Sequence, residues 1–256
     1  MAKGFFTDTS ICIGCKACEV ACKSWNQLPD DGFVFTGNSY DNTGHLGAST
    51  WRHVSFVERE APSGDGISWL LLSDVCKHCR RAACLEACPT GAIVRTGFDS
   101  VFIQPDVCNG CGYCVAACPF GVVDRREDDG RAWKCTLCYD RLQDGMEPAC
   151  AKACPTDSIR FGDLDELQRI ARARVEALHA QGVEEARLYG VDQPGTEGLN
   201  AFFLLLDEPE VYNLPPDPVA PAKQAAATWA SVAAGALCLG ALALGAALWG
   251  ARGGEG

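Results

Sequence analysis

Cys12-Ile13-Gly14-Cys15-Lys16-Ala17-Cys18-Glu19-Val20-Ala21-Cys22 is the stretch of this 256-residue chain that decides its fold. Three later stretches also gather four cysteines each, so that sixteen of the 17 cysteines fall into tight quartets. The later quartets are Cys76, Cys79, Cys84 and Cys88; Cys108, Cys111, Cys114 and Cys118; and Cys135, Cys138, Cys150 and Cys154. Thiols at this density predict either bound metal or a framework of disulfides.

The spacing within the quartets favours iron–sulfur clusters. Cys-x2-Cys-x2-Cys-x3-Cys-Pro is the ligand pattern of bacterial ferredoxins, in which the fourth cysteine binds the other cluster of a pair. The three later quartets end in Cys-x-x-x-Cys-Pro, at Pro89, Pro119 and Pro155, whereas the first is followed by Lys23. Sixteen thiolates are enough for four [4Fe–4S] cubes. Four redox centres in so small a domain predict a path for electrons.

Two other uses of the cysteines compete with this interpretation. Structural zinc sites pair two Cys-x2-Cys units across a longer stretch, and the second and fourth quartets could be read that way. The first and third could not, because three cysteines within seven residues suit one face of a cube. Cysteines spaced by two residues also make a poor disulfide framework, so both alternatives are disfavoured.

The composition limits the possible functions. The net charge of −11 argues against nucleic acid as a partner, because phosphate binding needs a basic surface. No nucleophile–base pair, phosphate-binding loop or paired-carboxylate motif stands out, and no quartet lacks a ligand. These observations favour electron transfer over catalysis, so the chain is not expected to be an enzyme by itself. Met1 to Asp8 has no long apolar run and no twin arginine, and is not expected to direct export.

The segments between the quartets predict an α+β fold of two bacterial dicluster ferredoxin-like modules with insertions. Residues 91–96 and 101–104 flank a Gly/Asp/Ser turn and predict a hairpin between the second and third quartets. Residues 5–9 and 158–161 predict the outer strands of a second module. The four-cluster domain is expected to span residues 1–162, with an insertion at 23–75.

The insertion and the C-terminal extension have their own predicted elements. Residues 51–58 and 68–72 predict two strands of the insertion, and 37–42 a Gly/Asn-rich loop. The extension, 163–216, is expected to contain a helix over 163–182, with Asp163 and Glu166 as a capping box. A strand over 202–206 follows, and a proline-rich linker, 217–224, comes after the extension.

Residues 225–250 carry no charged side chain, and we expect them to form one C-terminal transmembrane helix before a short tail, 251–256. Trp229 and Trp249 lie twenty residues apart, about 30 Å along a helix, which matches the apolar thickness of a bilayer. A buried alanine-rich helix is the alternative. Small residues such as Ala236 and Gly240 would let a partner helix approach closely.

The remaining metal-binding residue types give no further site. Cys238 is expected to be an apolar filler, and His78 a surface residue. Residues 225–250 contain no His or Met, so any haem must belong to a partner. Five cations near cluster cysteines either raise the potential of an anionic cluster or are ordinary solvated charges, and the two readings are equally supported. These cations are Lys16, Lys23, Lys77, Lys134 and Arg141.

The order of the quartets, with Lys134-Cys135-Thr136-Leu137-Cys138 opening the last, resembles the four-cluster iron–sulfur subunits of molybdenum or tungsten bis-pterin oxidoreductases. Within that group the chain is most similar to the iron–sulfur (beta) subunit of membrane-bound formate dehydrogenases. Other stretches carry the same likeness: residues 4–8, 12–23, 47–52, 147–150 and 212–215.

The resemblance implies four [4Fe–4S] clusters with a crossed ligand scheme, in which each cluster takes three cysteines from one quartet and the fourth from another. The implied sets are Cys12, Cys15, Cys18 and Cys154; Cys76, Cys79, Cys84 and Cys118; Cys108, Cys111, Cys114 and Cys88; and Cys135, Cys138, Cys150 and Cys22. Related nitrate reductase subunits replace one cysteine of the third quartet by tryptophan. Cys111 is present here, so all four cubes are expected to be complete.

The resemblance also implies a circuit. A catalytic molybdopterin (molybdenum or tungsten) alpha subunit oxidises formate, and electrons pass through this chain to a membrane cytochrome b (gamma) subunit and the quinone pool. The subunit would be a single-pass protein of the cell inner membrane. Its cluster domain would be periplasmic, exported with a partner that bears the signal. The alternative is the same relay role in a polysulfide, thiosulfate or sulfoxide reductase.

Overall fold

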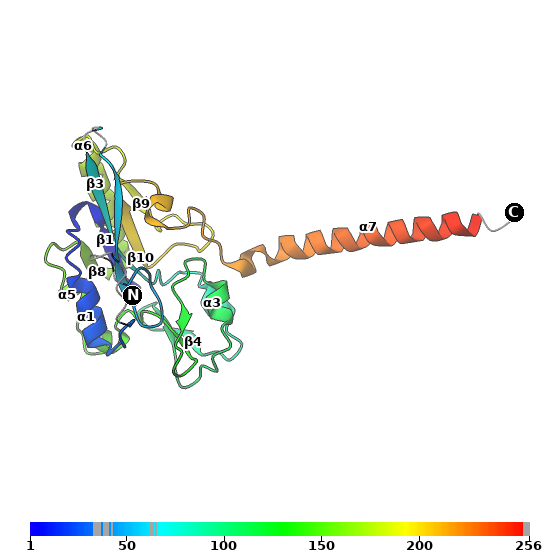
Figure 1. Ribbon diagram of the computed structural model, residues 1–256, viewed down its shortest axis with the longest axis horizontal. Helices are drawn as coiled ribbons and strands as arrows, with labels where there is room; N and C mark the ends of the chain where they lie inside the picture. Colours follow the sequence, from blue (N-terminus) through cyan, green and yellow to red (C-terminus); the bar gives the residue numbers. More distant parts are fainter. Residues whose placement is uncertain (33–36, 38–40, 42, 62–63, 65, 253–256) are drawn as a thin grey trace. The chain divides into compact units, whose positions relative to one another are not determined.

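The computed structural model describes residues 1–32, 37, 41, 43–61, 64 and 66–252 (Figure 1). They divide into two units, Met1–Ala220 and Pro221–Gly256. Part of the loop predicted at 37–42 and positions 253–256 of the tail lie outside the described residues.

A four-stranded sheet in the order β8-β1-β10-β9 forms the centre of the first unit. Its strands are β1 (Lys3–Asp8), β8 (Ile159–Asp163), β9 (Arg187–Tyr189) and β10 (Ala201–Leu205). β1 pairs antiparallel with β8 and parallel with β10. The predicted strands at both ends of the cluster domain are therefore confirmed, as is the strand at 202–206. The prediction that residues 5–9 form an outer strand is wrong, because β10 pairs with the free edge of β1.

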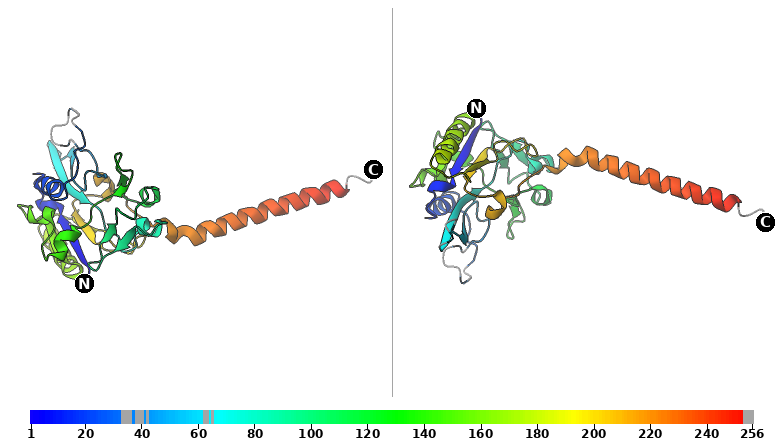
Figure 2. Two further views of the ribbon diagram at one scale, coloured as in Figure 1. Left: turned by 90° about the horizontal axis from the view of Figure 1, so that it is seen from below. Right: turned by 90° about the horizontal axis from the view of Figure 1, so that it is seen from above.

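Successive side chains of a strand point to opposite sides of the sheet. The two central strands, β1 and β10, are buried on both sides. On one face, Phe5, Phe203 and Leu205 pack in the same core cluster as many of the cysteines. On the other, Phe6 and Phe202 pack with α6 (Leu164–Ala180), which lies against this face (Figure 2). The sheet thus separates the cysteine-rich half of the unit from a conventional apolar core.

The predicted helix over 163–182 is confirmed by α6, but its predicted capping box does not form. Asp163 occupies the N-cap position without a side-chain capping bond. Its Oδ1 instead accepts a hydrogen bond from Lys3 Nζ at 2.8 Å, and Glu166 pairs with Arg169 one turn along the helix. The carboxylates that the pattern assigned to the cap are therefore used to join α6 to β1 and to pair along its exposed side.

The other strands in the part of the chain that the structure describes form three hairpins. β2 (Arg52–Glu60) and β3 (Ile67–Val75) confirm the strands predicted in the insertion, and pair from Arg52 with Val75 to Glu60 with Ile67. β4 (Ile93–Arg95) and β5 (Val101–Ile103) confirm the hairpin between the second and third quartets. A third hairpin joins β6 (Asp124–Arg125) to β7 (Ala132–Trp133).

Short helices lie within the cysteine quartets or beside them, and four of these helices contain cysteines: α1 (Ala17–Trp25), α2 (Ala83–Glu86), α3 (Tyr113–Ala117) and α5 (Ala149–Lys152). A fifth, α4 (Tyr139–Gln143), directly follows Cys138. In α2, α3 and α5 the Cys-Pro pair follows within a few residues, and proline disfavours helical geometry in the residue before it. Because Lys23 replaces that proline, α1 continues for nine residues. Three 3₁₀ turns, η1 (Thr9–Ile11), η2 (Pro209–Tyr212) and η3 (Pro221–Gln224), complete the described elements.

The second unit contains η3 and one helix, α7 (Ala225–Arg252). The expectation of a helix here is confirmed. The expectation that it spans a membrane is not supported: among the residues that the structure describes, none of the helices combines the length and the apolar character needed to cross a bilayer.

Candidate metal centres

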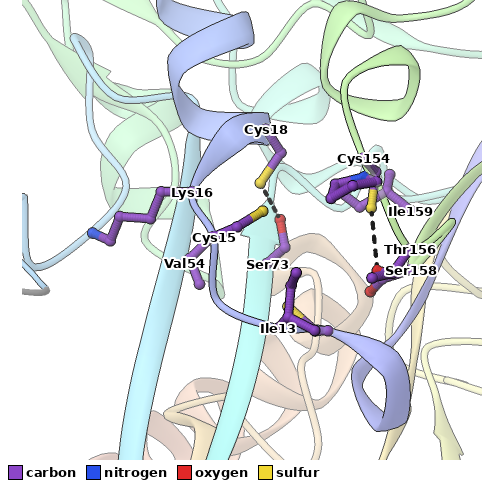
Figure 3. Close-up of a pocket in the computed structure, with 12 residues that line it drawn as sticks. Ile13, Cys15, Lys16, Cys18, Val54, Ser73, Cys154, Thr156, Ser158 and Ile159 are labelled. Carbon is purple, nitrogen blue, oxygen red and sulfur yellow. Dashed lines mark hydrogen bonds between the residues drawn. The ribbon is translucent and has the colours of Figure 1, made fainter.

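The cysteines of the first unit gather into four groups, each combining residues far apart in the sequence. Group I consists of Cys12, Cys15, Cys18 and Cys154, which together line one pocket (Figure 3). Ser73 lies 3.2 Å from the Cys18 sulfur through its Oγ, and Thr156 Oγ1 lies 3.8 Å from Cys154 Sγ. The loop from η1 into α1 and the turn after α5 therefore surround one space.

Group II consists of Cys22, Cys135, Cys138 and Cys150. α1 and α5 lie side by side (Figure 1), which brings Cys22 to Cys150. Burial raises the pKa of Cys22 well above its usual value, and the negative charge that Cys150, Cys135 and Cys138 would carry raises it further. Two donors point at these sulfurs: Asn26 Nδ2 lies 3.6 Å from Cys22 Sγ, and Arg52 Nη2 lies 3.2 Å from Cys150 Sγ.

Groups III and IV combine the second and third quartets. Group III consists of Cys76, Cys79, Cys84 and Cys118; burial raises the pKa of Cys79, and the other three sulfurs raise it further. Group IV consists of Cys88, Cys108, Cys111 and Cys114, which line a second pocket with Ile93, Ile103 and Ala132. α2 packs against α3, so each helix places its following cysteine near the other quartet.

The four cysteine loops share one backbone device. The residue before the second cysteine has positive φ in every quartet: Gly14 (66°), His78 (44°), Gly110 (73°) and Leu137 (61°). Positive φ reverses the direction of the chain and lets successive amide N–H groups face one concave side. This curvature lets a backbone amide donate to a cysteine sulfur in the fourth quartet, where the Leu137 amide donates to Cys135 Sγ at 3.4 Å.

Burial favours the protonated form of several of these thiols when no metal is bound. It raises the pKa of Cys18 to about 11, of Cys84 to about 12 and of Cys114 to about 11. Cys88 differs: although burial opposes the change, hydrogen bonds from Thr90 and nearby backbone amides lower its pKa. Because a metal binds the thiolate, ligation would remove protons from these groups, and the negative charge so created would need positive charge close by.

Two buried cations lie where such a charge would form. Arg52 is 1% exposed and Lys134 is 2% exposed. Although burial opposes it, the charges of Cys150, Cys18 and Cys135 raise the pKa of Arg52. Burial also opposes a raised pKa at Lys134, but the charges of Cys76, Cys84, Cys135 and Cys118 outweigh it and raise that pKa. The sequence analysis gave Arg52 no role, although Arg52 lies in the stretch 47–52 that carries the likeness to known subunits.

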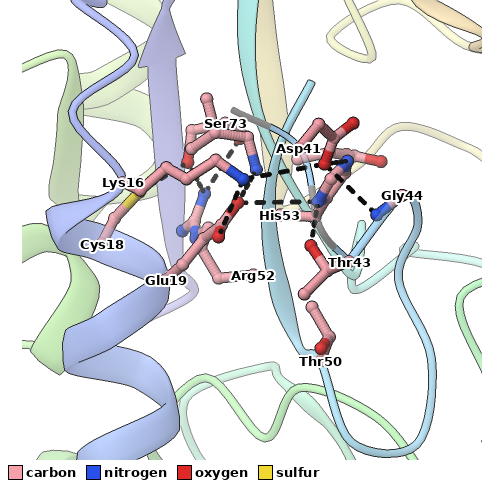
Figure 4. A network of polar contacts seen from close by, with 12 residues as sticks. Lys16, Cys18, Glu19, Asp41, Thr43, Gly44, Thr50, Arg52, His53 and Ser73 are labelled. Atoms are coloured by element: carbon pink, nitrogen blue, oxygen red, sulfur yellow. Dashed lines mark hydrogen bonds and ion pairs between the residues drawn. The ribbon is translucent and has the colours of Figure 1, made fainter. Parts of the chain in front are cut away.

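The other candidate cations are neutralised or turned outward. Lys16 lies 3.5 Å from Glu19 and 3.6 Å from Asp41, in a network that includes the buried His53 (Figure 4). Lys23 pairs with Asp31, and Lys77, although buried, pairs with Asp74. Arg141 stacks 4.2 Å from the Trp25 ring centroid. Of the five cations considered from the sequence, Lys134 stands apart as both buried and without a carboxylate partner among the described residues.

His78 is not the surface residue that was expected, because it is 1% exposed. Its Nδ1 accepts a hydrogen bond from the Val101 amide at 3.1 Å, and burial, followed by the nearby charges of Lys134, Arg95 and Arg52, holds its pKa well below the usual range. The imidazole is therefore neutral and joins the second cysteine loop to β5.

The chemistry of the groups fits clusters. All 17 cysteines are free thiols in the structure. Within the described residues, no three His, Cys, Asp or Glu side chains converge on a point that could hold a single metal ion. The thiols of groups I and IV instead line cavities, as the corners of a cube require, and the unpaired buried cations supply the countercharge of an anionic cluster.

Comparisons with known proteins agree with this chemistry. Family profiles described as "4Fe-4S dicluster domain" match residues 11–92 and 67–164. The chain is 45% identical to the formate dehydrogenase iron-sulfur subunit of Haemophilus influenzae, over 82% of this chain and 68% of that protein. It is 43% identical to the nitrate-inducible formate dehydrogenase iron-sulfur subunit of Escherichia coli, over 82% of this chain and 71% of that protein.

A more distant relative is the B subunit of the anaerobic dimethyl sulfoxide reductase of Escherichia coli, 37% identical over 65% of this chain and 76% of that protein. The formate dehydrogenase subunits thus match a longer part of the sequence at higher identity. Together with the cysteine groups, they show that this protein belongs to the family of formate dehydrogenase iron–sulfur subunits.

Proposed function

We propose that this chain relays electrons in a formate dehydrogenase complex through four [4Fe–4S] clusters, one held by each cysteine group. Group I would use Cys12, Cys15, Cys18 and Cys154; group II Cys22, Cys135, Cys138 and Cys150; group III Cys76, Cys79, Cys84 and Cys118; and group IV Cys88, Cys108, Cys111 and Cys114. Each bound cluster supplies reversible one-electron storage. The polypeptide supplies close spacing, burial and countercharge.

The observation that carries this proposal is the continuity of the groups. Cys18 of group I is close enough to Cys150 of group II for their charges to interact. The same holds for Cys135 of group II and Cys76 of group III, and for Cys84 of group III and Cys114 of group IV. The four groups therefore form a row, I–II–III–IV, in which each neighbour is in electrostatic reach of the next.

The ends of the row differ from its middle. Cys15 in group I and Cys111 in group IV are exposed, whereas Cys22, Cys76 and Cys150 of the inner groups are buried. Exposure at the two ends suits electron entry and exit, and burial of the middle keeps water away from the path. We propose that one end meets a catalytic molybdopterin alpha subunit and the other a membrane cytochrome b gamma subunit that reduces quinone.

The membrane part of the proposal depends on residues 225–250, which carry no Asp, Glu, Lys or Arg, and on the exposure of Leu237, Leu239 and Leu242. We propose that this segment attaches the subunit to the inner membrane or to its cytochrome partner. A periplasmic position of the cluster domain follows from the resemblance alone. Deleting residues 225–256 should weaken this attachment, so that washed membranes retain less of the truncated subunit than of the full-length one; equal retention of the two would refute the attachment.

The electron-relay proposal is tested by purifying the complex from detergent without air. Formate should bleach the cluster absorbance, and about sixteen iron atoms per chain are expected from four cubes. Clusters that dithionite reduces but formate does not would refute the formate assignment. Reoxidation by a sulfoxide instead of a quinone would favour the reductase role of the more distant relative.

A further inference from the structure

Arg52 and Lys134 are the buried cations that face the cysteine groups, and their positions point to more than a general balance of charge. Arg52 donates from Nη1 to Ser73 O at 3.1 Å (Figure 4). It also donates from Nη2 to Cys150 Sγ at 3.2 Å. Lys134 donates through Nζ to the carbonyl oxygens of Val101 and Cys135. No described carboxylate lies within 4.0 Å of either cation, although other cations of the unit have such partners.

An unpaired buried cation is unstable unless negative charge lies nearby. The guanidinium of Arg52 also lies over the Phe5 ring, 4.8 Å from its centroid, and its Nε has no hydrogen-bond partner within the described parts of the molecule. These contacts hold the charge in place without neutralising it. Its neutralising charge must therefore come from the sulfur atoms it faces.

The two cations occupy successive gaps in the row of groups. Arg52 faces Cys18 of group I and Cys150 and Cys135 of group II. Lys134 faces Cys135 of group II and Cys76, Cys84 and Cys118 of group III. Group II thus adjoins both cations, and groups I and III adjoin one each. In group IV, the largest charge effects on Cys114 come from cysteines of that group itself.

We propose that Arg52 and Lys134 set the reduction potentials along the row by stabilising added negative charge in groups I, II and III, with the largest effect in group II. This inference depends on the proposed function, because it concerns clusters bound by these groups. One-electron reduction adds one negative charge and forms or breaks no bond. A fixed cation at contact distance stabilises the reduced form more than the oxidised form, and so raises the potential.

The size of the effect follows from the contact of Arg52 Nη2 with Cys150 Sγ at 3.2 Å. A unit charge this close, at the effective dielectric constant of about 20 that suits buried sites, is expected to change the reduction equilibrium about tenfold or more. A tenfold change is a 59 mV shift for one electron. Lys152 is the matched control: it lies between Cys150 and Cys154 in sequence, but its side chain is 71% exposed, so solvent and salt screen its charge.

The experiment is a potentiometric titration of the complete complex, followed by electron paramagnetic resonance, with iron and sulfide content measured in every sample. Arg52→Met should lower two of the four midpoint potentials and Lys134→Met should lower two, with one midpoint common to both variants. In the double variant that shared midpoint should fall by about the sum of the two shifts. Arg52→Lys and Lys134→Arg should largely restore the potentials, and Lys152→Met should change none.

The outcomes separate this inference from the relay itself. If the unsubstituted complex holds little iron, the proposed function fails. If it is fully loaded but both methionine variants keep its midpoints, the relay stands and this inference is overturned. If one methionine variant loses iron, the midpoints of the other variant decide. If both methionine variants lose iron while the charge-conserving variants keep it, the cations hold the clusters in place and do not set their potentials. That result also overturns the inference.

Discussion

Replacing Gly110 by alanine should damage group IV more than the same change at Gly112, although the two glycines flank the same cysteine, Cys111. Both have a positive φ, 73° at Gly110 and 78° at Gly112. A Cβ on Gly110 would lie 2.4 Å from the carbonyl oxygen of Gly130, whereas a Cβ on Gly112 would find its nearest neighbour, Arg125 Cδ, at 3.5 Å. The comparison therefore separates the steric cost, which Gly110→Ala alone should show, from the conformational cost that both variants share.

The magnitudes follow from these two terms. Left-handed backbone costs a residue with a Cβ about 1–2 kcal/mol, and this cost applies to both variants. The contact at Gly110 is with backbone, so rotating a side chain cannot relieve it, and overpacking of this kind costs about 1–3 kcal/mol more. We expect destabilisation of about 1–2 kcal/mol for Gly112→Ala and about 2–5 kcal/mol for Gly110→Ala.

The assay is thermal release of iron to a ferrous chelator from the air-free complex. For a unit of this size, 1 kcal/mol corresponds to about 2–4 °C in midpoint temperature. Gly91→Ala is the control for the conformational cost alone, since Gly91 has φ 70° and no described atom within 4 Å of an added Cβ. Equal shifts for Gly110→Ala and Gly112→Ala would refute the steric reasoning.

Three further outcomes are expected. Cys22→Ser and Cys138→Ser should abolish the same paramagnetic signal and Cys18→Ser a different one, because the ligand sets cross between quartets; identical losses for Cys22→Ser and Cys18→Ser would refute the crossed scheme. Phe203→Ala, at a fully buried position in the sheet, should destabilise the first unit by about 3–5 kcal/mol. Ile67→Ala, at a 67% exposed position, should change the free energy of unfolding by no more than about 0.5 kcal/mol. Similar values for the two variants would contradict the described core. Stripping iron with a chelator under reducing conditions should lower the melting temperature of the first unit, since its buried cations lose their countercharge; calorimetry showing an unchanged transition would count against that pairing.

Much of the fold was accessible from periodicity and turn residues. The hairpin of β4 and β5, the two strands of the insertion and α6 all lie where the sequence predicts them. The sheet was harder, because strand pairing joins residues distant in the chain: nothing in the pattern of residues 201–205 says that they pair parallel with β1. The failed capping box at Asp163 has a similar cause, since Lys3 competes for its carboxylate.

The candidate sites divide in the same way. The division of the cysteines into four quartets could be read from the sequence, and the likeness to known subunits implied how the quartets combine. The burial of His78 could not be predicted, because it depends on β5 lying over the second cysteine loop. The importance of Arg52 was equally hidden, since its partner Cys150 lies 98 positions further along the sequence.

The cysteine spacings alone were enough to indicate the cofactor chemistry of this protein, because a cube face needs three thiolates from one tightly curved loop and such a loop is a local structure. The order of the groups along a row, the exposure of Cys15 and Cys111 at its ends, and the placement of Arg52 and Lys134 in its gaps were decided by the tertiary structure. These features depend on the distances between loops that the sheet, the hairpins and the paired helices hold together, and electrostatic effects depend on such distances and on burial. A pattern of residues along one sequence contains neither the distances between loops nor the burial of their side chains.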